Sequence, residues 1–247
     1  MSLRSTRNFA VAALALAGLA ASANAGITGS IITIEAKSSL GVASFEFITN
    51  SDFQNGVLVD GLSDSIDLTT EDGAVIASIT NLNVMFIADP VVNMNFSVFA
   101  GAVDTVFTIT SGLLTFSPLN NPDARASGGV TVTDSNGNGA WATGGYTDGK
   151  FFRAFYNGAN PGEGTQYASL IDGVSVPDAF GSDKASEESA AGFTTIAGAV
   201  SSMTTQFSFT ASALDQVSGT STFVVVPSPA ALTLASIGGL AMIRRKR

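Results

Sequence analysis

The chain of 247 residues contains no cysteine and no histidine. Without cysteine it cannot form a disulfide, a thiolate nucleophile or a cysteine-ligated metal site. Without histidine it has neither a Ser-His-Asp triad nor the commonest ligand of zinc. These absences exclude the enzyme sites that depend on cysteine or histidine. We expect a protein that is not an enzyme and that needs no cofactor, with calcium as the one possibility that the sequence offers.

Positive charge is also scarce. Lys and Arg number 11 against 20 Asp and Glu, and charged residues make up 13% of the chain, whereas an average domain has about 25%. The net charge of −9 argues against nucleic acid or an anionic membrane as a partner of the folded part. The length is sufficient for one all-β domain, or two smaller ones, with a substantial core.

Residues 1–25 predict a secretory signal peptide. Two arginines precede the uncharged apolar stretch 9–20, and Ala23 and Ala25 place small residues at positions −3 and −1 before Gly26. This order of positive charge, apolar helix and small residues is typical of secreted proteins. We therefore expect signal peptidase to cleave between Ala25 and Gly26.

Residues 227–247 form a second processing segment. It consists of Pro227, Ser228 and Pro229, the uncharged stretch 230–243, and the basic end Arg244, Arg245, Lys246 and Arg247. Fourteen helical residues rise roughly 21 Å, which is less than the roughly 30 Å of a hydrocarbon core, although terminal arginines can snorkel to the interface. By the positive-inside rule, the basic end stays in the cytoplasm and residues 26–226 lie outside.

This C-terminal pattern resembles the PEP-CTERM sorting signal of bacteria, a Pro-x-Pro motif followed by an apolar helix and an Arg-rich end. The family motif usually has Glu between the prolines, where this chain has Ser228. The resemblance implies transient membrane insertion, recognition near Pro227 and Pro229 by an exosortase-type membrane peptidase, and transfer to the cell surface or extracellular matrix in association with exopolysaccharide. It covers about the last twenty residues and leaves residues 26–226 unassigned. An ordinary C-terminal membrane anchor is the alternative.

The ectodomain between these segments, residues 26–226, is strongly acidic. It contains all 20 acidic residues and five basic ones, so its net charge is −15. The basic residues are Lys37, Arg125, Lys150, Arg153 and Lys184. Such a surface is soluble and repels acidic polymers.

The ectodomain predicts β-structure throughout. Apolar and polar residues alternate over 203–213, which is the period of a strand with one wet face. Many short alternating runs separated by Asn-Gly and Asp-Gly turns indicate an antiparallel β-sandwich, jelly-roll-like, framed by the signal helix and the C-terminal hydrophobic helix. Two polar segments, 117–129 and 176–192, predict long loops, and the second predicts a short helix over 183–190.

The strongest local candidate for chemistry is the sequence Asp-Ser-Asn-Gly-Asn-Gly at 134–139. Oxygen ligands from Asp134, Asn136 and Asn138, with Gly at the sixth position, resemble the front of a calcium loop. The bidentate Glu of such loops is missing, because the twelfth position is Gly145. The alternative is a tight hairpin turn between the flanking strands, since Asn and Gly readily adopt positive φ.

Trp141 is the only tryptophan of the chain, and further aromatic residues follow it. They are Tyr146, Phe151, Phe152, Phe155 and Tyr156. Exposed on a sheet face, such aromatics could stack on sugar rings, with hydrogen bonds from Asp148, Lys150 and Arg153. Packed inward, they would form part of the core.

Three functions compete for the ectodomain. The leading hypothesis is an exported, non-enzymatic surface or matrix protein delivered by the C-terminal signal. The second is a calcium-assisted carbohydrate-binding module on the same sandwich. The third is a secreted polysaccharide-degrading enzyme, although carboxylate pairs are inevitable among 20 acidic residues and prove nothing by themselves.

Overall fold

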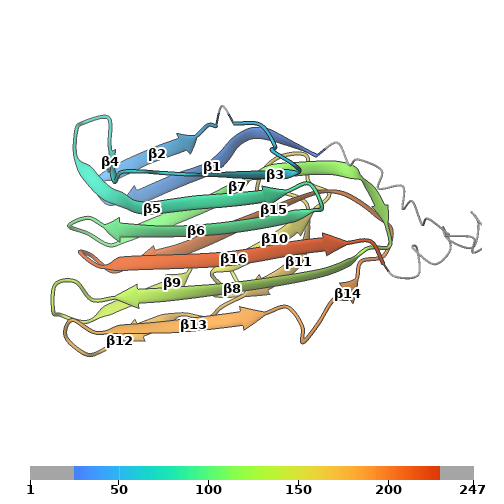
Figure 1. The fold of residues 1–247 in the computed structure, drawn as a ribbon. Coiled ribbons are helices and arrows are strands. Elements are labelled where there is room, and N and C mark those ends of the chain that lie inside the picture. Colours follow the sequence, from blue (N-terminus) through green and yellow to red (C-terminus); the bar gives the residue numbers. More distant parts are fainter. Residues whose placement is uncertain (1–24, 50, 229–247) are drawn as a thin grey trace, which may run out of the picture.

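The computed structural model describes residues 25–49 and 51–228, and these form two antiparallel β-sheets packed face to face (Figure 1). The predicted sandwich of an all-β chain is confirmed at this level. The jelly-roll detail stays a prediction. The signal helix and the C-terminal helix lie outside the described residues.

Sheet A has the order β11-β10-β15-β7-β1-β2, with β9 on β15 and β12 on β9. Its strands are β1 (Gly26–Ser38), β2 (Gly41–Phe47), β7 (Thr105–Asn120), β9 (Ala140–Gly144), β10 (Phe152–Tyr156), β11 (Thr165–Leu170), β12 (Val174–Val176) and β15 (Ala199–Ala211).

Sheet B has the order β13-β8-β16-β6-β5-β3, with β14 on β8 and β4 on β5. Its strands are β3 (Val57–Gly61), β4 (Ile66–Thr69), β5 (Val75–Ile87), β6 (Val91–Ala100), β8 (Asp123–Thr133), β13 (Ser182–Glu188), β14 (Thr194–Thr195) and β16 (Gln216–Val226).

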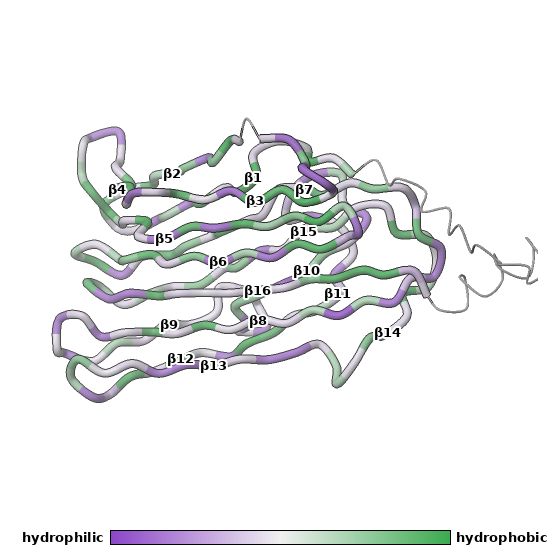
Figure 2. The backbone as a smooth tube through the Cα atoms, viewed as in Figure 1, coloured by the Kyte–Doolittle hydropathy of each residue, from purple (hydrophilic) through white to green (hydrophobic). Residues whose placement is uncertain are grey.

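Alternating burial explains why these segments form a sandwich. Every second residue of β8 and β16 is buried and its neighbours are partly or fully exposed, as expected for sheets with one inner face. The predicted strand at 203–213 is present as β15, which ends at Ala211. Figure 2 shows hydrophobic and hydrophilic residues interspersed along the strands of both sheets.

Phenylalanine side chains fill the space between the sheets. The ring of Phe96 from sheet B meets Phe207 from sheet A edge to face, with 5.0 Å between centroids. Phe209 stacks on Phe151 at 5.5 Å, and all four rings are buried. A Cβ at Gly219 would collide with the ring of Phe96, so the glycine of β16 makes room for this contact.

Both ends of the described chain leave the same end of the sandwich. Gly26 at the start of β1 pairs with Thr115 of β7, and Val226 at the end of β16 pairs with Asp123 at the start of β8. This terminal end lies at the right of Figure 1, where the grey traces begin.

The opposite end, at the left of Figure 1, is the loop end of the sandwich. Its connections are residues 39–40, 70–74, 101–104, 134–139, 177–181 and 212–215. Since strand direction decides which connections share an end, loops that are far apart in sequence meet here.

Two predictions about loops were wrong. The segment 117–129 belongs largely to β7 and β8, which are joined by a turn at 121–122. The segment predicted as a helix over 183–190 is mostly the edge strand β13, which pairs with β8 from Ser182 to Glu188. Charged side chains suit an edge strand because they discourage pairing with another chain, and this explains why the segment looked like a polar loop.

Candidate functional site

Asp134 organises the loop between β8 and β9. Its Oδ1 accepts the backbone N–H groups of Asn136 at 3.2 Å and Gly137 at 2.9 Å. Its Oδ2 accepts those of Gly139 at 3.0 Å and Phe180 at 2.8 Å. One carboxylate therefore ties its own loop to the loop at 177–181.

The Asp134 side chain is charged in this position. The residue is only 2% exposed, and burial by itself raises the pKa of its carboxyl. The four N–H donors outweigh that effect, and the pKa lies below its ordinary value of 3.8. Hydrogen bonds to the ionised form account for this direction.

Asp215 is a second buried carboxylate at the loop end, with 0% exposure. Its Oδ1 accepts the N–H of Ser135 at 3.1 Å, and its Oδ2 accepts the hydroxyl of Ser212 at 2.5 Å. The Ser212 oxygen in turn accepts the N–H of Trp141 at 2.9 Å. The backbone of Trp141 is thereby fixed, through Ser212, to the buried side chain of Asp215.

Two bulky residues at the loop end adopt left-handed backbone conformations. Phe180 has φ 56° and is 72% exposed, and Leu214 has φ 61° and is 44% exposed. Residues with large side chains rarely adopt this region. The ring of Phe180 lies over Gly137, where a Cβ would come within 2.6 Å of it. The hydrogen bonds of Asp134 and Asp215 hold the loops that contain this strain.

Two of the three predicted calcium ligands, Asp134 and Asn136, already make hydrogen bonds within the loop end, whereas the side chain of Asn138 makes none to the described residues. Asn136 donates from Nδ2 to the carbonyl of Ala213 at 3.1 Å, and its Oδ1 accepts the N–H of Asn138 at 3.0 Å. Both oxygens of Asp134 face backbone N–H groups. Residues 25–49 and 51–228 contain no group of three or more acidic side chains that could hold a metal ion. This geometry favours a turn, and the calcium site stays a prediction.

The turn at 134–139 is not the predicted hairpin. β8 lies in sheet B beside β13 and β16, whereas β9 lies in sheet A beside β12 and β15. The loop therefore crosses from one sheet to the other. The prediction was wrong because Asn and Gly indicate a turn without saying which strands it joins.

Trp141 lines an open pocket of about 420 Å³ at the loop end. It stands opposite Ser175 in the pairing of β9 with β12, and 36% of its surface is exposed. The pocket is lined by Asp104, Asn138, Gly139, Ala140, Trp141, Ser175, Val176, Pro177, Ser212 and Ala213. Four connections of the loop end, 101–104, 134–139, 177–181 and 212–215, thus meet at the pocket that Trp141 lines.

The structure divides the aromatic cluster that the sequence suggested. Phe151 and Phe152 are fully buried and Phe155 nearly so, whereas Trp141 is open to solvent. Tyr146 packs under the guanidinium of Arg153, 4.0 Å from the ring centroid. The core interpretation therefore holds for the phenylalanines, whereas Trp141 is exposed and its stacking on sugar rings stays a prediction.

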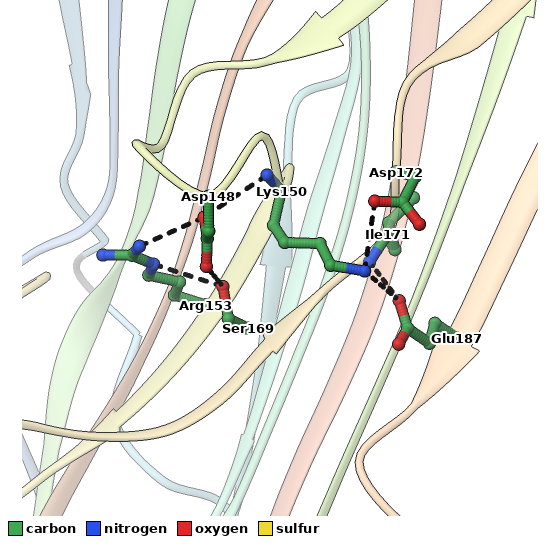
Figure 3. Close-up of polar contacts among 7 residues, drawn as sticks. All are labelled: Asp148, Lys150, Arg153, Ser169, Ile171, Asp172 and Glu187. Atoms are coloured by element: carbon green, nitrogen blue, oxygen red, sulfur yellow. Dashed lines mark hydrogen bonds and ion pairs between the residues drawn. The ribbon is translucent and has the colours of Figure 1, made fainter.

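The charged residues proposed as sugar contacts are engaged in hydrogen bonds and ion pairs within the fold (Figure 3). Asp148 accepts hydrogen bonds from Ser169 at 2.6 Å and Arg153 at 3.2 Å, and the bond from Ser169 contributes most to lowering the pKa of its carboxyl. Lys150 lies 3.1 Å from Glu187 and 3.2 Å from Asp172. Hydrogen bonding to Glu187 contributes most to raising the pKa of Lys150. This pair links the β9–β10 connection to β13 of the other sheet, a structural role.

The outer face of sheet B carries two shallow depressions of about 410 and 520 Å³. Both include Gly129, Ser186 and Thr220, which lie in one row across β8, β13 and β16. The face is polar and has no exposed aromatic residue among those that line the two depressions. It differs in this respect from the pocket around Trp141.

Few of the predicted processing residues lie in the described part. Gly26 begins β1, Ala25 precedes it, and Pro227 and Ser228 follow β16. Ala23, Pro229 and the basic residues Arg244, Arg245, Lys246 and Arg247 lie outside the described residues. Within residues 25–49 and 51–228, no helix has the length and hydropathy needed to cross a membrane.

No protein-family model and no curated protein matches this chain significantly. Among solved structures, the chain is similar to TmCBM61, determined in complex with β-1,4-galactotriose, at 11% identity and a TM-score of 0.29 over 70% of this chain and 88% of that one. It is also similar to a chain in the structure of the infectious bursal disease virus Gx strain, at 9% identity and a TM-score of 0.10, over 86% of this chain and 81% of the viral chain. At these TM-scores neither likeness supports a functional argument.

Proposed function

We propose that this protein is an exported, non-enzymatic cell-surface or extracellular-matrix protein associated with exopolysaccharide. In this proposal signal peptidase removes residues 1–25, and the hydrophobic helix at the C-terminus inserts transiently into the membrane. An exosortase-type peptidase then processes the segment around Pro227, Ser228 and Pro229. The sandwich of residues 26–226 is the part that reaches the outside.

One observation carries the proposal: the chain ends leave one end of the sandwich, and exposed large apolar residues gather at the other. The described chain begins beside β7 and ends beside β8 at the terminal end. At the loop end the exposed apolar residues are Leu40, Val42, Val75, Val106, Trp141, Phe180 and Leu214. A tail at one end leaves the opposite end free, and exposed apolar groups are typical of contact surfaces.

The experiment is a measurement of the intact mass and the location of the protein in the cells that produce it. We expect a mass that lacks residues 1–25 and the basic tail, in the surface or matrix fraction. Replacing Pro227 and Pro229 by Ala should leave the C-terminus uncleaved and the protein in the membrane. Replacing Pro122, which lies between β7 and β8, by Ala is the matched control and should leave sorting unchanged. An unchanged mass and unchanged release of the double variant would rule out the sorting signal.

A further inference from the structure

We propose that the pocket around Trp141 binds a pyranose ring of a neutral polysaccharide. The inference rests on the proposed function, because it names the chemistry by which an exported sandwich would hold exopolysaccharide. It is carried by one exposed aromatic side chain, two polar side chains without a hydrogen-bond partner among the described residues, one carboxylate with a single bonded oxygen, and an ordered backbone.

Trp141 supplies the apolar surface. An aromatic face carries partial negative charge, and the C–H groups on the less polar face of a sugar ring carry partial positive charge, so the two attract when the ring stacks on the indole. Trp141 is open to solvent, although the phenylalanines that follow it are buried in the core. A polar partner for the indole N–H is absent among the described residues, which leaves this donor for a ligand.

Polar groups around the indole suit sugar hydroxyls, which both donate and accept hydrogen bonds. Asn138 and Ser175 are exposed members of the lining, and their side chains make no hydrogen bond to other described residues. Asp104 accepts the N–H of Ala213 through Oδ1 at 3.0 Å, so its Oδ2 remains for a ligand. A carboxylate acceptor makes stronger hydrogen bonds than a neutral one.

The charge of the site selects neutral sugars. Asp104 is the one ionisable residue in the lining of this pocket and takes part in no ion pair within the described chain. A uronic acid placed against it would suffer like-charge repulsion, and the net charge of −15 over residues 26–226 adds to that repulsion. A neutral hexose meets no such cost.

The platform is also rigid before any ligand arrives. The N–H of Trp141 donates to Ser212, which donates to the buried carboxylate of Asp215. On the other side, Asp134 fixes the loop that presents Asn138. Because the loops are already ordered, a ligand loses little binding free energy to ordering them.

The test is a titration of the full-length chain, purified in detergent, with neutral and acidic tetrasaccharides. Trp141 is the only tryptophan, so its fluorescence reports on this pocket alone. We expect a saturable change with at least one of the β-1,4-linked gluco-, manno- and galacto-tetraoses. Tetragalacturonate should bind at least about tenfold more weakly, a difference of about 1.4 kcal/mol.

Calorimetry on variants then locates the site. We expect Trp141→Ala to weaken binding by at least about tenfold, and Asn138→Ala and Asp104→Asn by about three- to thirtyfold each. Phe193→Ala, which removes an exposed aromatic outside the pocket, is the matched control and should leave affinity unchanged. If Trp141→Ala does not fold, Asn138→Ala and Asp104→Asn carry the test, because both residues are exposed.

Three outcomes would overturn the inference: no neutral tetrasaccharide binds, binding survives Trp141→Ala, or tetragalacturonate binds most tightly. Binding that survives would place the site elsewhere, with the polar face of sheet B as the next location. The result is independent of export, because the chain is purified before the titration. If no sugar binds but the protein is processed as expected in cells, the proposed export stands and the sugar site is wrong. If sugar binds but the C-terminus is not processed, the sugar site stands and the proposed sorting is wrong.

Discussion

The two ends of the sandwich achieve left-handed backbone conformations in different ways. At the terminal end the residues with positive φ include Asn121 and Asn157, with φ 46° and 54°. Their side chains accept the N–H groups of Gly198 at 2.8 Å and Ser201 at 2.9 Å. Asparagine adopts this conformation at little cost because its side chain is short and polar, and here the same side chains also bind segments 77 and 44 positions away in the sequence.

At the loop end the corresponding residues are Phe180 and Leu214, whose side chains offer no such compensation. Two buried carboxylates hold the loops instead, Asp134 and Asp215. At both ends, segments far apart in sequence stabilise one another. At the terminal end the residue in the left-handed conformation makes the long-range hydrogen bond with its own side chain, whereas at the loop end separate buried aspartates make it. The pocket around Trp141 lies at the loop end.

The largest expected effect on stability is that of Asp215→Ala. This change leaves the N–H of Ser135 without its acceptor and removes the closer of the two acceptors of the Ser212 hydroxyl, the other being the carbonyl of Trp141. We expect a loss of about 3 kcal/mol in the free energy of unfolding. Urea unfolding measures it. Asp178→Ala, an exposed aspartate in a loop-end connection, is the control and should change stability by less than about 0.5 kcal/mol. Equal effects of the two changes would show that the buried carboxylate does not organise this end.

A medium effect is expected from exchanging the residue types of the two ends. Phe180→Asn should stabilise the protein by about 1 kcal/mol, because Asn tolerates the left-handed conformation better. Asn121→Ala should destabilise it by about 1 kcal/mol, because it removes both that tolerance and the hydrogen bond to Gly198. Thermal unfolding of both variants checks the signs. A destabilised Phe180→Asn variant would mean that the ring over Gly137 contributes more than the strain costs.

The smallest expected effect is the pH dependence of the Asp134 contacts. Since its pKa is lowered in the folded state, its contribution is complete above the ordinary value of 3.8 and is lost as the pH falls through the lower folded value. The difference in melting temperature between the parent and Asp134→Asn should therefore shrink from about pH 5 to about pH 2. A constant difference would contradict a role for the ionised form.

Calcium provides the control in the same melting experiment. Because the oxygens of Asp134 and Asn136 are bonded within the loop, we expect calcium chloride to leave the melting temperature of the parent unchanged. A rise that disappears in Asp134→Ala would restore the calcium site that the sequence suggested.

Much of the fold could be predicted from local pattern alone. The period-two alternation of 203–213 appears as β15, and no helix occurs within the described residues. Alternation of polar and apolar residues indicates a strand with one solvent-exposed face and one buried face, and a few neighbouring residues are enough to show it. The sequence did not predict the edge strand β13, because none of its residues is buried and its polar residues are of the types common in loops.

The candidate site could be predicted only in fragments. The sequence singled out Asp134 and Trp141, but it could not separate Trp141 from the aromatic residues that are buried. Asp215 gave no signal, because its role depends on Ser135, which is 80 positions away. Groups that pair across such separations are brought together by strand order and direction.

By itself, the sequence determined the class of structure: alternation makes sheets, and sheets with one apolar face must pack in pairs. It also excluded disulfides and the sites that specifically require cysteine or histidine, since the chain has neither residue. Only the tertiary structure decided that four distant loops meet at one pocket, that two aspartates are buried beside it, and that the tryptophan stays exposed. The physical reason is that periodicity is encoded in neighbouring residues, whereas a pocket is formed by side chains whose distance depends on the path of the whole chain.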